Sequence, residues 1–362
     1  MASDGFADLP PTGPLAATAR NGRVRIHDVA RRCGLSITTV SQALNLRADQ
    51  CRVSQQTRII VQRAADELGY RPSRMARGLA KGQSFTVGIL AWSVAPGGIY
   101  SEVISVLSET LATRGYHPIL APVNDRVEAW VQTMLDEQVD GCVVLNNVKT
   151  PLRIALSGAR LPVVMVNVES DLPAPQILID DVLGMRTLVE YLLSLGHRRI
   201  DFFNSGTEDL KVPPKDRHYG LRQREQSYRD TLTASGGTPR VVEIDCEAYV
   251  AQLVAMPPQE RPTAVICFWH RLAMRLMRML WERGLRVPED ISVATFNDPP
   301  EMLDFIPPIT TVALPEREIG KRAATVLLDR LSGSGEQLPP GHREYLPPKL
   351  IARGSTAVPP TT

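Results

Sequence analysis

The sequence predicts a small all-α head with a helix-turn-helix, followed by a larger two-lobed α/β body. Three observations support this prediction. Residues 24–45 have apolar side chains at helical spacing on both sides of a short turn. Basic charge is concentrated between residues 23 and 81. From residue 85 onward, apolar runs of strand length alternate with amphipathic segments, which is typical of a mostly parallel sheet with helices on both faces.

The first helix of the head is predicted near residues 26–33. Ile26, Val29, Ala30 and Cys33 recur at i, i+3, i+4 and i+7, which marks the buried stripe of an amphipathic helix. Gly34 can adopt the left-handed conformation that ends such a helix. We therefore expect the chain to turn at this glycine.

The second predicted helix follows at once and leaves one face open. Ser36 is placed to cap it, and Val40, Ala43 and Leu44 can pack inward. An open polar face of this kind has the geometry of a recognition helix, whose side chains reach base edges in a major groove of DNA. The open face consists of Ile37, Thr38, Ser41, Gln42 and Asn45.

A third helix completes the head. Ser54 is placed to cap it, and Gly69 to end it before Pro72. Three helices in about 45 residues form a marginal core, so we expect this unit to gain part of its stability from dimerisation or from DNA. The apolar face of the third helix consists of Val61, Ala64, Ala65 and Leu68.

The charge of the head suits contact with phosphates. Between Arg23 and Lys81 there are 12 Lys or Arg residues against four acidic ones, a local net charge of +8, whereas the whole chain carries +2. Basic charge gathered on one small segment is typical of a module that binds nucleic acid. The alternative is a solvated helical bundle, for which the excess of charge would be accidental.

Several phrases of the sequence resemble the lactose-repressor/galactose-repressor family, in the order in which that family has them. Those of the head are Asp28-Val29-Ala30, Gly34-Leu35-Ser36, Thr39-Val40-Ser41, Val53-Ser54, Thr57-Arg58, Leu68-Gly69-Tyr70-Arg71-Pro72 and Ala76-Arg77-Gly78-Leu79-Ala80. Those of the body include Leu195-Gly196-His197-Arg198-Arg199-Ile200 and Leu346-Pro347-Pro348-Lys349-Leu350. The resemblance implies a dimeric transcription factor, acting as a repressor, that binds a palindromic operator in double-stranded DNA and is modulated by a small-molecule effector.

The resemblance also divides the chain into domains. Residues 23–70 would form the helix-turn-helix domain and residues 71–83 a hinge helix with a linker. Residues 84–356 would form a two-lobed effector-binding and dimerisation domain of the periplasmic-binding-protein-like type I. Residues 1–22 are rich in Pro, Ala, Gly and Thr and are expected to be a disordered extension, and residues 357–362 a loose tail.

The hinge helix is expected at residues 73–80. It is too short to be stable alone, and Gly78 lowers its helix propensity further, so we expect it to fold when two copies pair on DNA. The resemblance implies that Leu79 is an apolar wedge inserted into the minor groove at the centre of the operator. The alternative is a plain linker. The residues expected to contact DNA are Arg25, Ser36, Ile37, Thr38, Thr39, Ser41, Gln42, Asn45, Ser54, Arg74, Ala76 and Leu79.

The head departs from the family at three places. Gln42 stands where the family often has an arginine that reads guanine, and its amide can pair with adenine instead. Arg25 stands where a Thr or Ser usually caps the first helix, which exchanges a cap for a possible phosphate contact. The loop at residues 46–52 is about three residues longer than usual. It either brings Arg47 or Arg52 to the DNA backbone or bulges into solvent.

The body is predicted to contain two sets of strands and helices. In the first set, strands are expected at residues 85–90, 117–123, 141–145 and 162–166, with helices at 102–113 and 127–138. A second set is expected to begin near Ile177, with a helix at 185–195 and a strand at 200–204. In such folds ligands bind at the carboxyl ends of the strands.

The expected effector pocket departs further from the family. Trp269 and His270 replace an Asn-Asp pair that helps to hold sugar hydroxyls, and Asn297 replaces a carboxylate. Arg224 stands where the family keeps a ligand-binding arginine. We therefore expect an anionic or aromatic effector in place of a neutral sugar, or a loss of effector control. The residues expected to contact the effector are Trp92, Tyr100, Asn146, Asp181, Arg224, Trp269, His270 and Asn297.

The remaining composition excludes other classes of protein. The five cysteines are scattered without paired spacing and are expected to be reduced thiols of a cytoplasmic protein. No metal-ligand cluster, phosphate-binding glycine loop or nucleophile motif is present, so we expect no enzyme activity, no metal and no cofactor. No stretch has the length of a signal peptide core or a membrane span. Together with the basic head, this argues against a sugar-binding protein of the transport type.

Overall fold

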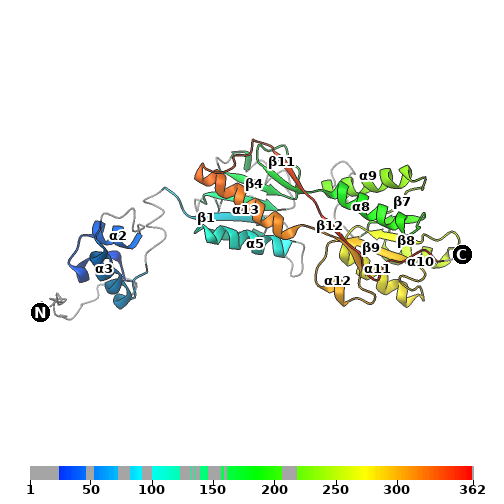
Figure 1. Ribbon diagram of the computed structural model, residues 1–362, viewed down its shortest axis with the longest axis horizontal. Helices are drawn as coiled ribbons and strands as arrows, with labels where there is room; N and C mark the ends of the chain where they lie inside the picture. Colours follow the sequence, from blue (N-terminus) through cyan, green and yellow to red (C-terminus); the bar gives the residue numbers. More distant parts are fainter. Residues whose placement is uncertain are drawn as a thin grey trace, which may run out of the picture. The chain divides into compact units, whose positions relative to one another are not determined.

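The computed structural model describes residues 24–45, 53–71, 82–91, 100–122, 132, 134, 139–145, 156–158, 161–205 and 218–360. Its internal contacts divide the chain into two compact units, Met1–Ser84 and Phe85–Thr362 (Figure 1). The loop at residues 46–52, the hinge at 73–80 and most of the helix expected at 127–138 lie outside the described residues.

The head contains the three predicted helices, α1 (Ile26–Cys33), α2 (Ile37–Asn45) and α3 (Gln55–Leu68). Gly34 and Gly69 end α1 and α3 with φ values of 65° and 66°, in the left-handed region that glycine adopts most easily. The Oγ atoms of Ser36 and Ser54 accept the backbone N–H of Thr39 and Thr57, as expected of N-caps. The buried core consists of Val29, Ala30, Val40, Ala43, Val61, Ala64 and Ala65.

Arg25 precedes α1, and its side chain does not cap the helix. The carboxylate of Asp28 instead reaches back and accepts the backbone N–H of Arg25 at 2.9 Å, while the Asp28 N–H donates to the Arg25 carbonyl at 2.9 Å. One half of a capping box therefore stabilises this end of α1. The guanidinium of Arg25 is left exposed.

The first lobe of the body is a six-stranded parallel sheet in the order β11-β5-β4-β3-β1-β2. Apolar side chains fill its central strands, which are buried on both faces as expected of a parallel sheet. Helices α5 (Tyr100–Thr113) and α13 (Glu316–Ser332) pack on this lobe. The strands are β1 (Thr86–Ala91), β2 (His117–Pro122), β3 (Gly141–Leu145), β4 (Val163–Val166), β5 (Gln176–Ile179) and β11 (Arg343–Leu346).

The second lobe is another six-stranded sheet, in the order β12-β10-β9-β8-β6-β7, in which only β12 pairs in the antiparallel sense. Its strands are β6 (Ile200–Phe203), β7 (Arg240–Val242), β8 (Ala264–Cys267), β9 (Ser292–Phe296), β10 (Thr310–Ala313) and β12 (Lys349–Ile351). Its helices are α8 (Asp181–Ser194), α9 (Tyr219–Ala234), α10 (Cys246–Ala255), α11 (His270–Glu282) and α12 (Glu301–Asp304).

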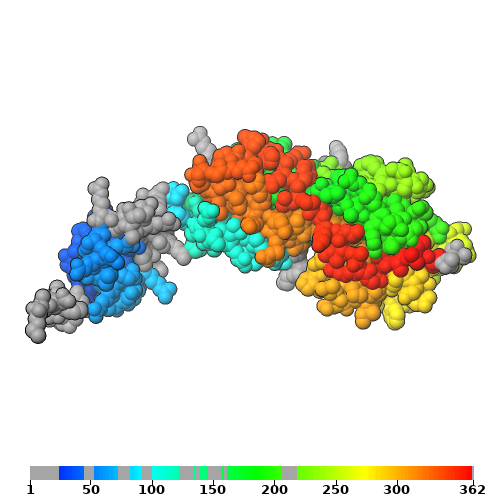
Figure 2. All heavy atoms as spheres, viewed as in Figure 1, coloured from blue at the N-terminus to red at the C-terminus, as the bar shows by residue number. Residues whose placement is uncertain are grey.

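The chain crosses between the lobes three times, which corrects one prediction. The strand at Ile177 is β5, and it belongs to the first sheet, where it pairs with β4 and β11. The second lobe therefore begins only at α8, whose N-cap is Asp180. The other crossings join β10 to α13 and β11 to β12. In Figure 2 the C-terminal segment, coloured red, extends over both lobes.

Gly320 allows α13 to lie close against α5. A Cβ atom at this position would lie 2.6 Å from the carbonyl oxygen of Val103 and 3.2 Å from the backbone nitrogen of Leu107. Both are helix backbone atoms, which cannot move aside as the end of a side chain can. The two helices therefore stay in close contact in the first lobe, as Figure 1 shows.

Ala357, where the sequence predicted the start of a loose tail, is hydrogen-bonded to the second lobe. The Ala357 carbonyl lies 2.8 Å from Nε2 of His197, and its N–H donates to Oγ of Ser292 at 3.1 Å. The first residue of the expected loose tail is thus part of the second lobe. Cys142, Cys246 and Cys267 are buried free thiols, as predicted for core cysteines, and Cys51 lies outside the described residues. Among the described helices, none is long and apolar enough to span a membrane.

Candidate DNA-reading face and effector site

Helix α2 presents the polar face that the sequence predicted. Thr38 is exposed, the side chain of Ile37 is 46% exposed, and Ser41 and Gln42 are half-buried. The polar groups of Thr39 already have a partner within the head: its backbone N–H and its hydroxyl are hydrogen-bonded to Oγ of Ser36, at 3.1 and 2.8 Å. Three of the expected DNA contacts, Arg74, Ala76 and Leu79, lie outside the described residues. For Asn45 only the backbone is described.

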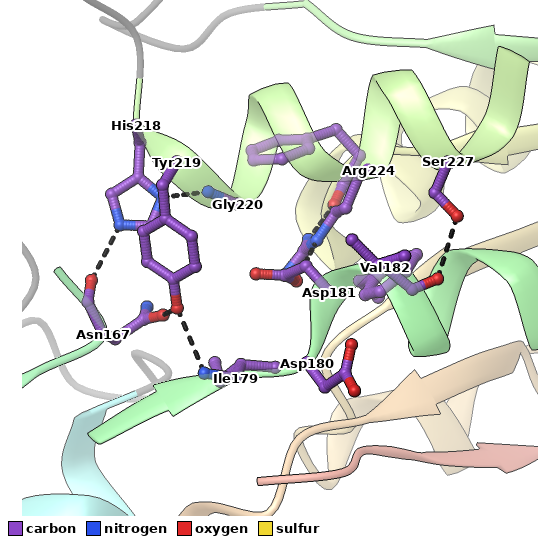
Figure 3. Close-up of polar contacts among 12 residues, drawn as sticks. Asn167, Ile179, Asp180, Asp181, Val182, His218, Tyr219, Gly220, Arg224 and Ser227 are labelled. Carbon is purple, nitrogen blue, oxygen red and sulfur yellow. Dashed lines mark hydrogen bonds and ion pairs between the residues drawn. The ribbon is translucent and has the colours of Figure 1, made fainter. Parts of the chain in front are cut away.

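In the body, the first crossing between the lobes carries a network of buried polar groups, which we call the inter-lobe latch. It consists of the side chains of Tyr100, Asn167, His218 and Tyr219 and the backbone N–H of Ile179. Figure 3 shows Asn167, Ile179, His218 and Tyr219. Tyr100, Asn167 and Ile179 belong to the first lobe. His218 and Tyr219 lie at the start of α9 in the second lobe.

Asn167 is the centre of the latch. Its Oδ1 accepts the hydroxyl of Tyr219 at 2.6 Å, and its Nδ2 donates to the hydroxyl of Tyr100 at 2.5 Å. Asn167 has a φ of 55°, a left-handed conformation that asparagine tolerates better than most residues. Tyr219 also accepts the N–H of Ile179 at 3.1 Å. Burial raises the pKa of both tyrosines, so both stay neutral at physiological pH.

His218 adds a second bond between the lobes. Its Nδ1 accepts the backbone N–H of Gly220 at 3.1 Å, which caps α9. A neutral imidazole with an accepting Nδ1 carries its proton on Nε2. That nitrogen therefore donates to the Asn167 carbonyl, at 2.8 Å.

Arg224 and Asp181 form a buried ion pair beside the latch, which Figure 3 also shows. Nε of Arg224 donates to Oδ1 of Asp181 at 2.6 Å, and Nη1 donates to the carbonyl of Phe268 at 2.9 Å. The guanidinium lies 3.9 Å from the ring centroid of Phe296. The side chain of Arg224 is 7% exposed and that of Asp181 is 1% exposed. Both residues were expected at the effector site, but the charge of Arg224 is already compensated by Asp181 and is not a free cation.

Trp269, His270 and Asn297 lie together at the carboxyl ends of β8 and β9. His270 is buried, and its Nδ1 lies 3.2 Å from Nδ2 of Asn297. Burial lowers the pKa of His270 to about 4, so the ring is neutral at physiological pH. Trp92 and Asn146, the other expected effector contacts, lie outside the described residues.

Asn167, His218 and Tyr219 were not predicted from the sequence. Asn167 follows the last residue of a buried strand, β4, and a polar residue at that place was a usable signal. No comparable signal marks His218 or Tyr219, because their role depends on where α9 begins. Among the described residues, no group of three or more His, Cys, Asp or Glu side chains is placed to hold a metal ion.

The second crossing, from β10 to α13, lines a cavity of about 270 Å³ with acidic side chains. Glu316 lies at the start of α13, near Glu102 of the first lobe and Asp298 of the second. Burial, followed by the charges of these two carboxylates, raises the pKa of Glu316 to about 7. This carboxyl therefore binds a proton more tightly in the folded than in the unfolded protein.

We expect Glu316→Gln to stabilise the body at pH 8. Because the folded pKa lies above the usual value, the stabilising contribution of the protonated carboxyl is lost as the pH rises from about 4.5 to about 7. The neutral amide avoids this loss, so the free energy of unfolding of the variant at pH 8 should exceed that of the wild type by about 1–2 kcal/mol. Urea unfolding of both proteins at pH 5 and pH 8 measures this difference, which should be present at pH 8 and absent at pH 5. Glu318→Gln, an exposed neighbour on the same turn, should show no such difference.

Comparison with known proteins agrees with both units. Residues 25–73 match bacterial regulatory proteins of the lacI family, and residues 189–356 match the periplasmic binding protein-like domain. The chain is 32% identical over 357 residues to the HTH-type transcriptional repressor CytR of Escherichia coli (strain K12), covering 94% of this chain and 99% of that protein. The chain belongs to the LacI family. It is also 32% identical over 314 residues to the HTH-type transcriptional repressor PurR of Vibrio vulnificus (strain CMCP6), covering 84% and 91% of the two chains.

Solved structures of LacI-family proteins share the fold. A crystal structure of the lac repressor dimer bound to operator and the anti-inducer ONPF matches with a TM-score of 0.77 and 27% identity, over 92% of this chain and 99% of that one. The transcriptional regulator CelR in complex with cellobiose matches with a TM-score of 0.65 and 27% identity, over 92% and 100%. The relatives are transcriptional repressors and not enzymes. As a LacI-family member, the chain is a DNA-binding transcriptional repressor modulated by an effector.

Proposed function

We propose that this LacI-family protein binds an imperfect palindromic operator in the cytoplasm as a homodimer, and that a small molecule between the lobes of the body controls this binding. The observation that supports it best is the open polar face of α2 on a basic head. A two-fold symmetric pair of such heads matches symmetric half-sites. The lac repressor, a structural relative, is a dimer on its operator.

Footprinting of the full-length protein on DNA selected from a random library tests this proposal. We expect two half-sites related by a two-fold axis, and sedimentation of the complex should give two protein chains for each duplex. A single asymmetric half-site occupied by one chain at physiological salt would overturn the proposal. The salt concentration must be held constant, because phosphate contacts make every affinity depend on it.

Gln42→Arg should change the preferred base at one symmetric position in each half-site. Gln42 lies one helical turn after the exposed Thr38, and we propose that its amide pairs with adenine, whereas an arginine would favour guanine. The discrimination should be about 1–3 kcal/mol. Repeating the selection with the variant measures this. An unchanged consensus would place Gln42 away from the bases.

Leu79→Ala should weaken binding to the operator far more than binding to random DNA. An apolar wedge contributes only where the duplex is kinked, while attraction to the phosphates does not depend on it. Titration of both DNAs with the wild type and the variant checks this. Equal losses on the two DNAs would favour the plain linker.

We also propose that the effector is not a simple neutral sugar. Trp269 and His270 stand in place of the polar pair that would hold hydroxyl groups, and His270 is buried against Asn297. Of the two expectations from the sequence, the aromatic effector keeps its support. The anionic one loses it, because Arg224 is paired with Asp181. The family's modulation by an effector argues against the other expectation from the sequence, a loss of effector control.

A further inference from the structure

Four buried side-chain atoms have no hydrogen-bond partner in the part of the chain that the structure describes. They are Nδ2 and Oδ1 of Asn204, Nε1 of Trp269 and Oδ1 of Asn297. Asn204 has no exposed surface, and Asn297 is 6% exposed. A buried polar group without a partner costs about 1–3 kcal/mol, and native proteins keep few of them. Four such atoms on three residues therefore call for a binding partner.

The three residues come from one edge of one sheet. Asn204 follows β6, Trp269 follows β8 by two residues, and Asn297 follows β9. These strands are neighbours in the order β9-β8-β6 and run parallel, with Phe203 beside Cys267 and Ile266 beside Ala294. The unpaired atoms thus share the carboxyl edge of the second lobe, where α/β sheets bind their ligands.

The charges near this edge are already compensated. Arg224 is paired with Asp181, and Asp298 accepts two bonds from Arg353, at 2.6 and 2.9 Å. His270 is neutral at physiological pH. An anionic or cationic ligand would find no opposite charge among these groups. The carboxylates of Asp181 and Asp298 could accept hydrogen bonds from the hydroxyls of a sugar, but both are paired with arginines.

The unpaired atoms themselves describe the complementary molecule. Asn204 presents a donor and an acceptor side by side in one plane, and a side-chain amide of this kind pairs with a planar edge that carries an acceptor beside a donor. Nε1 of Trp269 adds a donor, and Oδ1 of Asn297 adds an acceptor. The set has two donors and two acceptors and no net charge.

We propose that the effector is a neutral, planar molecule with an amide-type edge, a carbonyl or ring nitrogen next to an N–H group, and that Asn204 binds this edge. Lactams, carboxamides and nucleobases share this chemistry. The inference rests on the proposed function, because it names the ligand class of the same control site. It assigns to Asn204 the anchoring role that the sequence had suggested for Arg224.

Thermal-shift and calorimetric titrations of the full-length protein test the ligand class. The probes are uracil, cytosine and nicotinamide, with glucose and benzoate as a neutral polyol and an anion without the edge. We expect at least one of the first three to bind and raise the melting temperature, and neither of the last two. A hit with a nucleobase alone or with nicotinamide distinguishes the sources of the edge. Binding of glucose or benzoate alone, or of no probe, would overturn the proposal.

Asn204→Leu tests the anchor. Removal of an unpaired buried amide should leave the melting temperature of the ligand-free protein unchanged or higher, while the affinity for the bound probe falls at least tenfold. Gln176→Met is the matched control, because both amide atoms of that buried side chain are paired with the backbone of Ser170, at 3.1 and 2.8 Å. It should lower the melting temperature and leave probe affinity unchanged.

Asn204→Ala, which adds neither bulk nor charge, replaces the leucine variant if the latter does not fold. It removes the donor and the acceptor together and should also lower the affinity for the probe at least tenfold. Probe binding unchanged in either folded variant would overturn the role of Asn204. Operator binding by the ligand-free wild type separates the two proposals. Its absence contradicts the proposed function, whereas intact operator binding with no probe bound contradicts only the ligand class.

Discussion

Arg224→Met is expected to destabilise the body by about 3–5 kcal/mol, because it leaves the carboxylate of Asp181 buried without its counter-charge. Asp181 is 1% exposed, so water cannot replace the lost arginine. The substitution also removes the bond to the Phe268 carbonyl and the stacking on Phe296. Urea unfolding of the wild type and the variant at pH 7 measures the loss.

Arg222→Met on the same helix is the control. Arg222 also pairs with a carboxylate, that of Glu169 at 3.3 Å, but its side chain is 47% exposed. Exposed pairs contribute about 0–1 kcal/mol, so this variant should be close to the wild type. Combining Arg224→Met with Asp181→Asn should recover most of the loss, since the unpaired charge is then gone. If Arg224→Met and Arg222→Met lowered the free energy of unfolding equally, the buried pair would contribute no more to stability than the exposed one.

A destabilisation of this size would affect any experiment that substitutes Arg224 in order to identify the effector. A protein that has lost several kcal/mol of stability can fail to respond to a ligand because it is partly unfolded. Arg224 variants therefore do not report on ligand contacts alone. Asn204 is the better position, because its amide has no partner to lose among the described residues.

The head was predictable because its signals are local. The stripe on α1, the caps at Ser36 and Ser54 and the turn at Gly34 each depend on a few consecutive residues. The strand and helix order of the body was predictable for the same reason. The sheet to which each strand belongs was not predictable. The sequence of β5 indicates a buried strand but does not indicate that it pairs with β4 in the first sheet.

The candidate site was predicted less well, because its contacts join residues that are far apart in the chain. The resemblance placed Arg224 and Asp181 at the site but could not show that they bind each other across 43 positions. The left-handed backbone of Asn167 is equally invisible, because the turn after β4 carries no glycine to mark it. The sequence shows the identity of a polar residue but does not indicate whether its side chain is already hydrogen-bonded in the fold.

Asn167→Ala is expected to cost about 2–4 kcal/mol and to weaken the coupling between effector and operator. The hydroxyl of Tyr219 loses its acceptor in a buried site, and alanine tolerates a φ of 55° less well than asparagine. The latch is where Asn167 of the first lobe holds the start of α9 of the second. An effector can control DNA binding only by favouring one arrangement of the lobes. A weaker latch should change that preference.

Two further variants separate the causes. Asn167→Gly relieves the backbone strain and should recover about 1 kcal/mol relative to alanine. Tyr219→Phe removes one hydroxyl and leaves the backbone of Asn167 as it is. If the latch couples the lobes, all three variants change the ratio of operator affinities with and without effector, while the affinity of the ligand-free protein for random DNA stays constant. If stability falls and this ratio does not move, the latch holds the lobes together without transmitting the signal.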